Sequence, residues 1–259
     1  MKKDIYSLMD DVLQHRRQLQ LWFETDLGQG ILQLEKHKIS RVLPDLFGYH
    51  ILQLGYLENH HLLDSSRISH KLISGLILDE NTNSNVDLVC SNYAIPIVSD
   101  SMDVVVLPHL LEFESNPHQL LRETQRILIG EGCVIILGFN PVSLWGMSRL
   151  FLAWTDKPPW CGHYIGLTRL KDWLKLLGFE IVTIERFYYR PPVQNKKIMQ
   201  RLAIIEQLGN YCWPFFAGIY LLVAKKSVIP VTPLKLEWQK RRNMIASGAA
   251  EPSTRILEN

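Results

Sequence analysis

The sequence is poor in cysteine, and this shortage already excludes some classes of protein. Among 259 residues there are four cysteines, Cys90, Cys133, Cys161 and Cys212, and none forms a CxxC pair. We therefore expect neither a disulfide framework nor a zinc site of the CxxC type. Cys90 and Cys133 fall in apolar, strand-like runs, which indicates buried, reduced thiols and a cytoplasmic location.

The sequence also lacks a charge excess of either sign. It has 28 basic and 26 acidic residues and a net charge of +2, which gives no basic surface of the kind that binds nucleic acid. We expect no nucleic-acid partner. The adjacent His60 and His61 would point in different directions, and no other spacing suggests a metal site. Nucleophile-elbow (GxSxG) and Walker-type (GxxxxGK[ST]) motifs are missing as well.

Long hydrophobic runs are the third absence. Residues 2–4 are Lys-Lys-Asp, and no apolar block of a secretory signal follows them. The apolar run at 215–224 is about half of the ~20 residues that a membrane-spanning helix needs, and a buried strand explains it better. We expect no membrane partner. The hydrophobic fraction of 47% is nevertheless enough for a substantial core.

The pattern of the chain changes at about residue 44. Leu27, Ile31 and Leu34 share one helical face, which predicts helix over residues 1–44, with Pro44 as its end. After that, strand-like and helical patterns alternate. The predicted strands are residues 50–54, 71–78, 86–90, 103–107, 133–137, 179–187 and 219–223.

Capping residues place the helices between these strands. Asn116 and Pro117 predict a helix start, and the buried stripe of this helix runs to Leu128 before Gly130 and Gly132 end it. Thr168 can cap a second helix that Gly178 ends. A third is predicted at 198–208.

Alternation of this kind predicts an α/β fold with a doubly wound, mostly parallel sheet covered on both faces. The last two strands could instead form an antiparallel pair at the sheet edge. We predict an N-terminal helical extension at 1–44, the α/β domain at 45–226 and a flexible tail at 227–259.

Residues 95–106 resemble the LPF-x-D-x-S-x-D-x-V segment of class I methyltransferases of the type 11 group, and residues 117–128 are similar to that group's P-x-x-x-L-x-E-x-x-R-x-L helix. The segments LPHLLEF (107–113) and GFNPVSLWG (138–146) look like a bacterial subgroup of this family. The resemblance covers about residues 26–226. It implies a Rossmann-like domain that uses S-adenosylmethionine (SAM) as its cofactor.

The sequence departs from the family where the cofactor binds. The family ends its first strand with an acid followed by G-x-G-x-G, but here Gln53 replaces the acid and only Gly55 remains, with Leu57 and Asn59 at the other glycine positions. The Asp that reads adenine falls on Ser91. A glutamine can hydrogen-bond but brings no negative charge toward a cationic cofactor. The subgroup itself shares the glutamine and the thinned glycines.

Ligands of such sheets bind beyond the carboxyl ends of the strands. The resemblance therefore implies cofactor contacts at Gln53, Gly55, Tyr56, Ser91, Asn92 and Pro108. Each has a structural alternative: Gly55 could be a turn glycine, Gln53 could bond neighbouring backbone, and the Ser91 hydroxyl could cap its own turn.

On the acceptor side, His109 is the candidate catalytic base, because an ordinary histidine pKa of ~6.5 suits proton removal at neutral pH. It could instead stabilise its loop, with or without Glu112 as a partner. Asn140 and Trp145 are candidate substrate-binding residues. The alternatives are that Asn140 forms a turn before Pro141 and that Trp145 packs a helix onto the sheet.

These features predict a methyltransferase that moves a methyl group from SAM to a small-molecule acceptor. The eroded cofactor motif leaves a second hypothesis open, a catalytically inactive protein of this fold that serves as a binding module. A nucleotide-dependent oxidoreductase is less favoured because no G-x-G-x-x-G follows the first strand.

Overall fold

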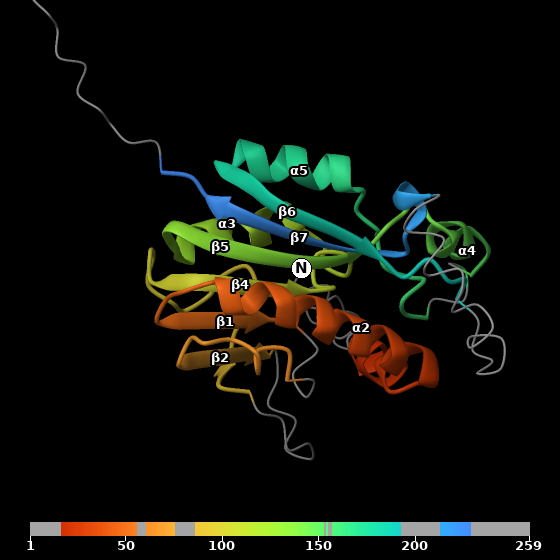
Figure 1. Ribbon diagram of the computed structural model, residues 1–259, viewed down its shortest axis with the longest axis horizontal. Helices are drawn as coiled ribbons and strands as arrows, with labels where there is room; N and C mark the ends of the chain where they lie inside the picture. Colours follow the sequence, from red (N-terminus) through yellow and green to blue (C-terminus); the bar gives the residue numbers. More distant parts are fainter. Residues whose placement is uncertain are drawn as a thin grey trace, which may run out of the picture. The chain divides into compact units, whose positions relative to one another are not determined.

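The alternating patterns fold into one sheet in the computed structural model, which describes residues 17–55, 61–75, 86–152, 154, 157–192 and 213–228 (Figure 1). All of these residues belong to one compact unit that ends at Val228. Within them the sheet has seven strands. These are β1 (His50–Leu54), β2 (His70–Gly75), β3 (Leu88–Val89), β4 (Met102–Pro108), β5 (Leu128–Phe139), β6 (Phe179–Phe187) and β7 (Ile219–Lys226).

The strand order is β3-β2-β1-β4-β5-β7-β6. The first five strands are parallel, whereas β7 lies between β5 and β6 and is antiparallel to both. The antiparallel alternative is therefore the one that the last two strands adopt. The chain reverses its winding direction between β1 and β4, which is the place where sheets of this type bind ligands.

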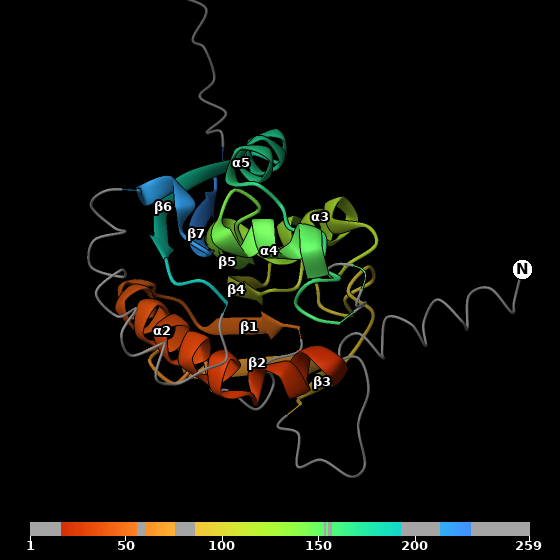
Figure 2. The same ribbon diagram turned by 90° about the vertical axis from the view of Figure 1, so that its right-hand side faces the viewer.

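The central strands are apolar along their length because both faces of the sheet are covered. In β4 six of the seven residues are buried, and in β7 the first six are buried. Figure 2 shows helix α2 (Asp26–Val42) on one face and helix α3 (Pro117–Ile127) on the other. Two-sided coverage explains why these strands carry runs of Val, Ile and Leu rather than an alternating pattern.

The helix ends follow from local hydrogen bonds. Thr25 caps α2 by accepting a bond from the Gly28 N–H at 3.2 Å, and Asn116 caps α3 in the same way through the Gln119 N–H. Helix α5 (Leu167–Leu176) is followed by Gly178, whose φ of 78° suits glycine. Residues 17–23 are also helical, and the further helices are η1 (Leu43–Asp45), α4 (Leu144–Leu152) and η4 (Pro214–Phe216).

Several predicted boundaries were wrong. The strand predicted at 133–137 spans Leu128–Phe139, and the helix predicted over residues 1–44 is interrupted at residues 24–25. Helix α3 ends at Ile127, because Leu128 is already extended and pairs with Met102 of β4. Gly132 lies inside β5 rather than after a helix, and a Cβ there would stand 3.1 Å from the Asp103 carbonyl oxygen, so the glycine permits close strand packing. The cap of α5 is Gly166, and Thr168 lies within its first turn.

Some predictions fall outside the described residues. These are the part of the second strand after Gly75, the helix at 198–208 and the tail from residue 229 onward. The divisions at residues 44 and 226 stay predictions. Within the described part of the chain, no helix is both long and apolar enough to cross a membrane.

Candidate functional site

The tip of β1 lies against the tip of β4. Gly55 follows β1 directly and has a φ of 125°, a backbone conformation that residues other than glycine rarely adopt. A Cβ at this position would stand 3.5 Å from the Pro108 carbonyl oxygen and 3.6 Å from the Leu110 Cβ, which are ordinary contacts. The backbone conformation therefore requires glycine here. Two predicted cofactor residues, Gly55 and Pro108, are brought together at the switch point of the sheet.

Gln53 lies two residues before this tip and is buried, with 1% of its surface exposed. In register it pairs with Ile73 of β2 and with Val106 of β4. Tyr56 lies outside the described residues, as do Leu57 and Asn59. Cofactor contact by Gln53 and Tyr56 stays a prediction.

The tip of β3 carries the other two predicted cofactor residues. Ser91 is exposed, and its hydroxyl accepts a bond from the Tyr93 N–H at 3.3 Å, so the structure shows the turn-capping arrangement. Asn92 is buried and its amide donates to Glu114 Oε1 at 2.7 Å. Contacts of either residue with an adenine ring remain predictions.

The loop after β4 holds a buried ionic cluster, which we call the His109 cluster: Glu35, His109 and Glu112. His109 Nε2 lies 2.6 Å from Glu35 Oε1, and its Nδ1 lies 3.3 Å from Glu112 Oε2. All three side chains are almost fully inaccessible. The φ of His109 is 48°, a left-handed conformation that costs a non-glycine residue about 1–3 kcal/mol. The two carboxylates hold the ring in place against this strain.

Glu112 connects the cluster to neighbouring strands and loops. Its carboxylate accepts a hydrogen bond from the Phe139 N–H at the tip of β5, and its backbone carbonyl accepts one from the His163 N–H at 2.7 Å. Glu35 comes from α2. The cluster therefore joins the N-terminal helix, the β4 loop, the β5 tip and the segment before α5.

Burial and charge act against each other on the His109 ring. Desolvation alone would lower its pKa, but attraction to Glu35 and hydrogen bonds to both carboxylates raise that pKa to about 10. Burial also raises the pKa of Glu112. His109 is therefore an imidazolium at neutral pH, with both ring nitrogens donating. In this arrangement neither nitrogen can accept a proton, so a base role would require one carboxylate to withdraw and the ring to lose its proton.

Aromatic rings surround the cluster. The Phe139 ring lies 4.3 Å from the His109 ring, and the Tyr164 ring lies 5.2 Å from that of Phe139, between centroids. Glu35 Oε2 and the Tyr164 hydroxyl are buried and have no hydrogen-bond partner among the described residues. Buried polar atoms are nearly always paired, so these two are positions where a water molecule or a ligand would be stabilised.

Asn140 and Trp145 have their polar groups engaged. The Asn140 amide donates to the carbonyls of Phe215 and Ala217 at 2.8 and 2.9 Å, and its oxygen accepts from the Val142 N–H. The Trp145 indole donates to the Arg190 carbonyl at 3.0 Å and stacks on Phe139. The structural alternatives given for both residues are present, and substrate contact stays a prediction.

Glu35 is the cluster member that the sequence analysis missed. It lies four residues after Ile31 and four before Ile39, on the buried face of α2. A carboxylate on such an apolar face needs a buried partner, and this position in the pattern could have indicated that Glu35 belongs to a buried ionic cluster. Glu112 was anticipated as a partner of His109. Among the described residues, no group of three or more His, Cys, Asp or Glu side chains could hold a metal ion.

The strand order, the antiparallel β7 and the glycine at the β1 tip define the Rossmann-like fold of class I methyltransferases. In agreement, residues 52–136 match the family Methyltransf_11, described as a methyltransferase domain. The match runs from β1 into β5 and includes Gly55 and His109.

Individual proteins are also similar to this chain, one in sequence and two in fold. The uncharacterized protein YafS of Escherichia coli is 29% identical over 233 residues, which cover 88% of this chain and 90% of that protein. A SAM-dependent methyltransferase from Thermotoga maritima superposes with a TM-score of 0.56 at 14% identity, over 75% of this chain and 89% of that one. One from Archaeoglobus fulgidus gives 0.53 at 20% identity, over 75% and 94%.

Proposed function

We propose that this protein is a SAM-dependent methyltransferase that acts on a small-molecule acceptor. The observation that carries the proposal is the positive-φ Gly55 against the β4 tip, at the switch point of a methyltransferase-type sheet. The methyltransferase-domain match over residues 52–136 supports it, because this segment contains both strand tips.

The backbone at the β1 tip is compatible with the cofactor, but the acidic side chain that the family places at position 53 is replaced by a neutral glutamine. Gly55 keeps the β1 tip free of a side chain, and Gln53, Ser91, Asn92 and Pro108 would complete the contacts. Gln53 stands where the family has an acid, so the side chain at this position brings no negative charge toward the cationic groups of SAM. Hydrogen bonds to a charged partner are stronger than neutral ones, so we expect weaker binding than an acid at position 53 would give.

Bound SAM would supply an electrophilic methyl group on its sulfonium. This chain would contribute alignment, since an in-line displacement gains most from holding the two reactants in position. The His109 cluster and the Asn140 hydrogen bonds fix the β4 and β5 tips for that purpose. Because His109 is held as an imidazolium, the arrangement favours an acceptor that is already a free nucleophile, such as a neutral amine, over a hydroxyl that must first lose a proton.

Isothermal titration with SAM and with its demethylated product tests the proposal. We expect saturable binding of both to the wild type and at least about tenfold weaker binding to Gly55→Ala. The matched control is Gly178→Ala, because Gly178 also has a positive φ but ends α5 and has open space around its Cβ position. A substitution there should cost about 1 kcal/mol or somewhat more of stability, as at Gly55, and leave affinity unchanged. Absence of binding at millimolar ligand would overturn the proposal.

A binding module without catalysis is the second candidate. It is favoured by Gln53 in place of an acid and by a His109 ring whose two nitrogens are both engaged. Such a protein would bind the cofactor or another ligand and transfer no labelled methyl group to any acceptor. A thermal-shift comparison of SAM, its product and nicotinamide cofactors would separate the two candidates from an oxidoreductase, because a ligand of the native state raises its melting temperature.

A further inference from the structure

Helix α4 has apolar side chains on its outer side as well as its inner side. Trp145 faces inward and is fully buried. Met147, Leu150 and Phe151, at i, i+3 and i+4 spacing, are 54%, 80% and 73% exposed, and Trp154 just beyond the helix is 89% exposed. A helix of a globular protein normally turns polar residues toward water, so this outer face needs a partner.

A second segment extends this apolar face. Trp213 and Phe215, at η4, are 61% and 67% exposed. The two segments are linked, because Asn140, just before α4, donates hydrogen bonds to the carbonyls of Phe215 and Ala217. Figure 2 shows α4 and η4 (blue) at the same end of the sheet. We call Met147, Leu150, Phe151, Trp154, Trp213 and Phe215 the α4–η4 surface.

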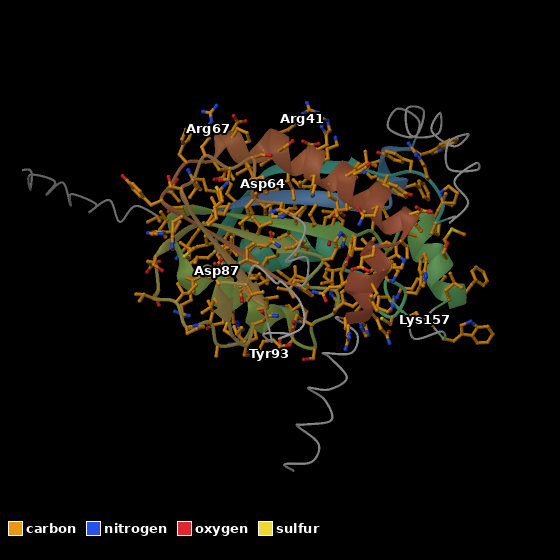
Figure 3. All side chains as sticks on the ribbon, turned by 90° about the horizontal axis from the view of Figure 1, so that it is seen from below. Arg41, Asp64, Arg67, Asp87, Tyr93 and Lys157 are labelled. Carbon is orange, nitrogen blue, oxygen red and sulfur yellow. The ribbon has the colours of Figure 1, made fainter. Side chains whose placement is uncertain are left out.

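The charged residues near this surface are basic. The Arg186 guanidinium lies 5.2 Å from the Phe215 ring centroid. Arg149 also lies on α4, but its Nε donates to the Trp160 carbonyl at 3.2 Å and its guanidinium lies over the buried Tyr164 ring. Lys157 is exposed and projects beside α4 (Figure 3). The described residues of the segments 140–167 and 213–217 include neither Asp nor Glu. A ligand of this surface should therefore combine apolar material with negative charge.

We propose that the α4–η4 surface docks this protein on an anionic phospholipid membrane. Trp, Phe and Leu side chains would enter the boundary between headgroups and acyl chains, and Lys157 and Arg186 would contact lipid phosphates. This is attachment to the surface of a bilayer rather than a span. It departs from the expectation of no membrane partner, which rested on the lack of a long apolar run. A second copy of the chain is a poorer occupant, since it would bring the same basic residues against one another. The inference does not rest on methyl transfer.

Vesicle flotation with the full-length protein tests this inference. We expect binding to phosphatidylcholine vesicles that contain phosphatidylglycerol, weaker binding to phosphatidylcholine alone, and loss of binding at high salt. Leu150→Ser should weaken binding at least about tenfold, because it removes one buried leucine from the complex. The matched control is Leu176→Ser on α5, where the leucine is 84% exposed but lies on another helix. It should bind as the wild type does.

Charge-reversal variants measure the electrostatic contribution to vesicle binding separately from the apolar one. Lys157→Glu should weaken binding to the anionic vesicles by about tenfold, whereas Lys175→Glu, on α5, should not. Failure of the wild type to bind anionic vesicles would overturn the inference. So would a dimer that Leu150→Ser dissociates, which would make the surface a contact between copies. A melting temperature several degrees lower in Leu150→Ser than in Leu176→Ser would also overturn it, since the leucine would then be covered by the chain itself.

Discussion

The two groups of strand tips at the carboxyl edge are built differently. At the tips of β1 and β3, the structure has a glycine in a positive-φ conformation and an exposed serine that bonds only its own turn. At the tips of β4 and β5, it has a buried imidazolium between two carboxylates and an asparagine whose side chain makes three hydrogen bonds. The first group suits ligand approach, and the second suits rigidity.

This difference separates stability from binding. Substitutions at the β4 and β5 tips should lower the free energy of unfolding by about 1–5 kcal/mol, because they leave buried charges or carbonyls without partners. Substitutions at the β1 and β3 tips should change ligand affinity at a smaller cost in stability, about 1 kcal/mol or somewhat more at Gly55 and less at Ser91. Mutational studies of function are therefore best begun at the β1 and β3 tips.

The largest expected effect is at Glu35. Glu35→Gln removes a buried carboxylate from its imidazolium partner and should lower the free energy of unfolding by about 3–5 kcal/mol, measured by urea denaturation. The control is another ion pair that involves α2: Lys38 of this helix pairs with Glu185 of β6 at 2.7 Å near the surface, and Glu185→Gln should cost at most about 1 kcal/mol. Equal losses in the two variants would show that the His109 cluster does not brace the fold.

A smaller effect is expected at Asn140. Asn140→Ala leaves the buried carbonyl of Ala217 without its side-chain donor, along with that of Phe215, and should cost about 1–3 kcal/mol. Ser91→Ala, at the β3 tip, should change the free energy of unfolding by less than about 0.5 kcal/mol. Thermal melts of the two variants in parallel would measure the difference in stability. A larger loss of stability in Ser91→Ala than in Asn140→Ala would contradict the prediction.

The response of stability to pH is the most gradual of these effects, because it is spread over the range from about pH 6.5 to 10. The pKa of His109 is raised from 6.5 to about 10 in the folded state, so its stabilising contribution is complete below about pH 6.5 and is lost as the pH rises toward 10. The pKa of Glu112 is raised by burial from 4.5, so its contribution also falls with rising pH, but over a window that begins near pH 4.5. We expect the melting temperature to fall between pH 6.5 and 10, with a flatter slope in His109→Gln. A wild-type curve that is level or rises across this window would contradict the assignment.

Local signals in the sequence predicted much of the sheet. Strands β1 and β6 were placed at their observed bounds, because a glycine or a helix cap stands directly beside each apolar run. Helix α3 began where Asn116 and Pro117 indicated, but its end was missed, since Leu128 is held in β5 by pairing with Met102. That pairing is a tertiary contact, which local patterns do not contain.

The site was harder to predict for the same reason. His109 was identified from its place after a strand, and Glu112 from its nearness in sequence. Glu35 is 74 residues from His109 along the chain, and only the fold brings the two side chains together. The predicted roles of Asn140 and Trp145 depended on which groups their side chains meet, and the structure provides partners for both from distant segments.

The bond between α2 and the β4 loop has a practical consequence for work on this protein. The N-terminal helices could be mistaken for an appendage that can be trimmed to obtain a minimal domain. A version beginning at residue 45 would remove Glu35, leaving an interior cation with one counter-ion instead of two. Such a fragment would be a poor stand-in for the whole chain, and a lack of activity in it would carry no information about the reaction that the intact protein performs.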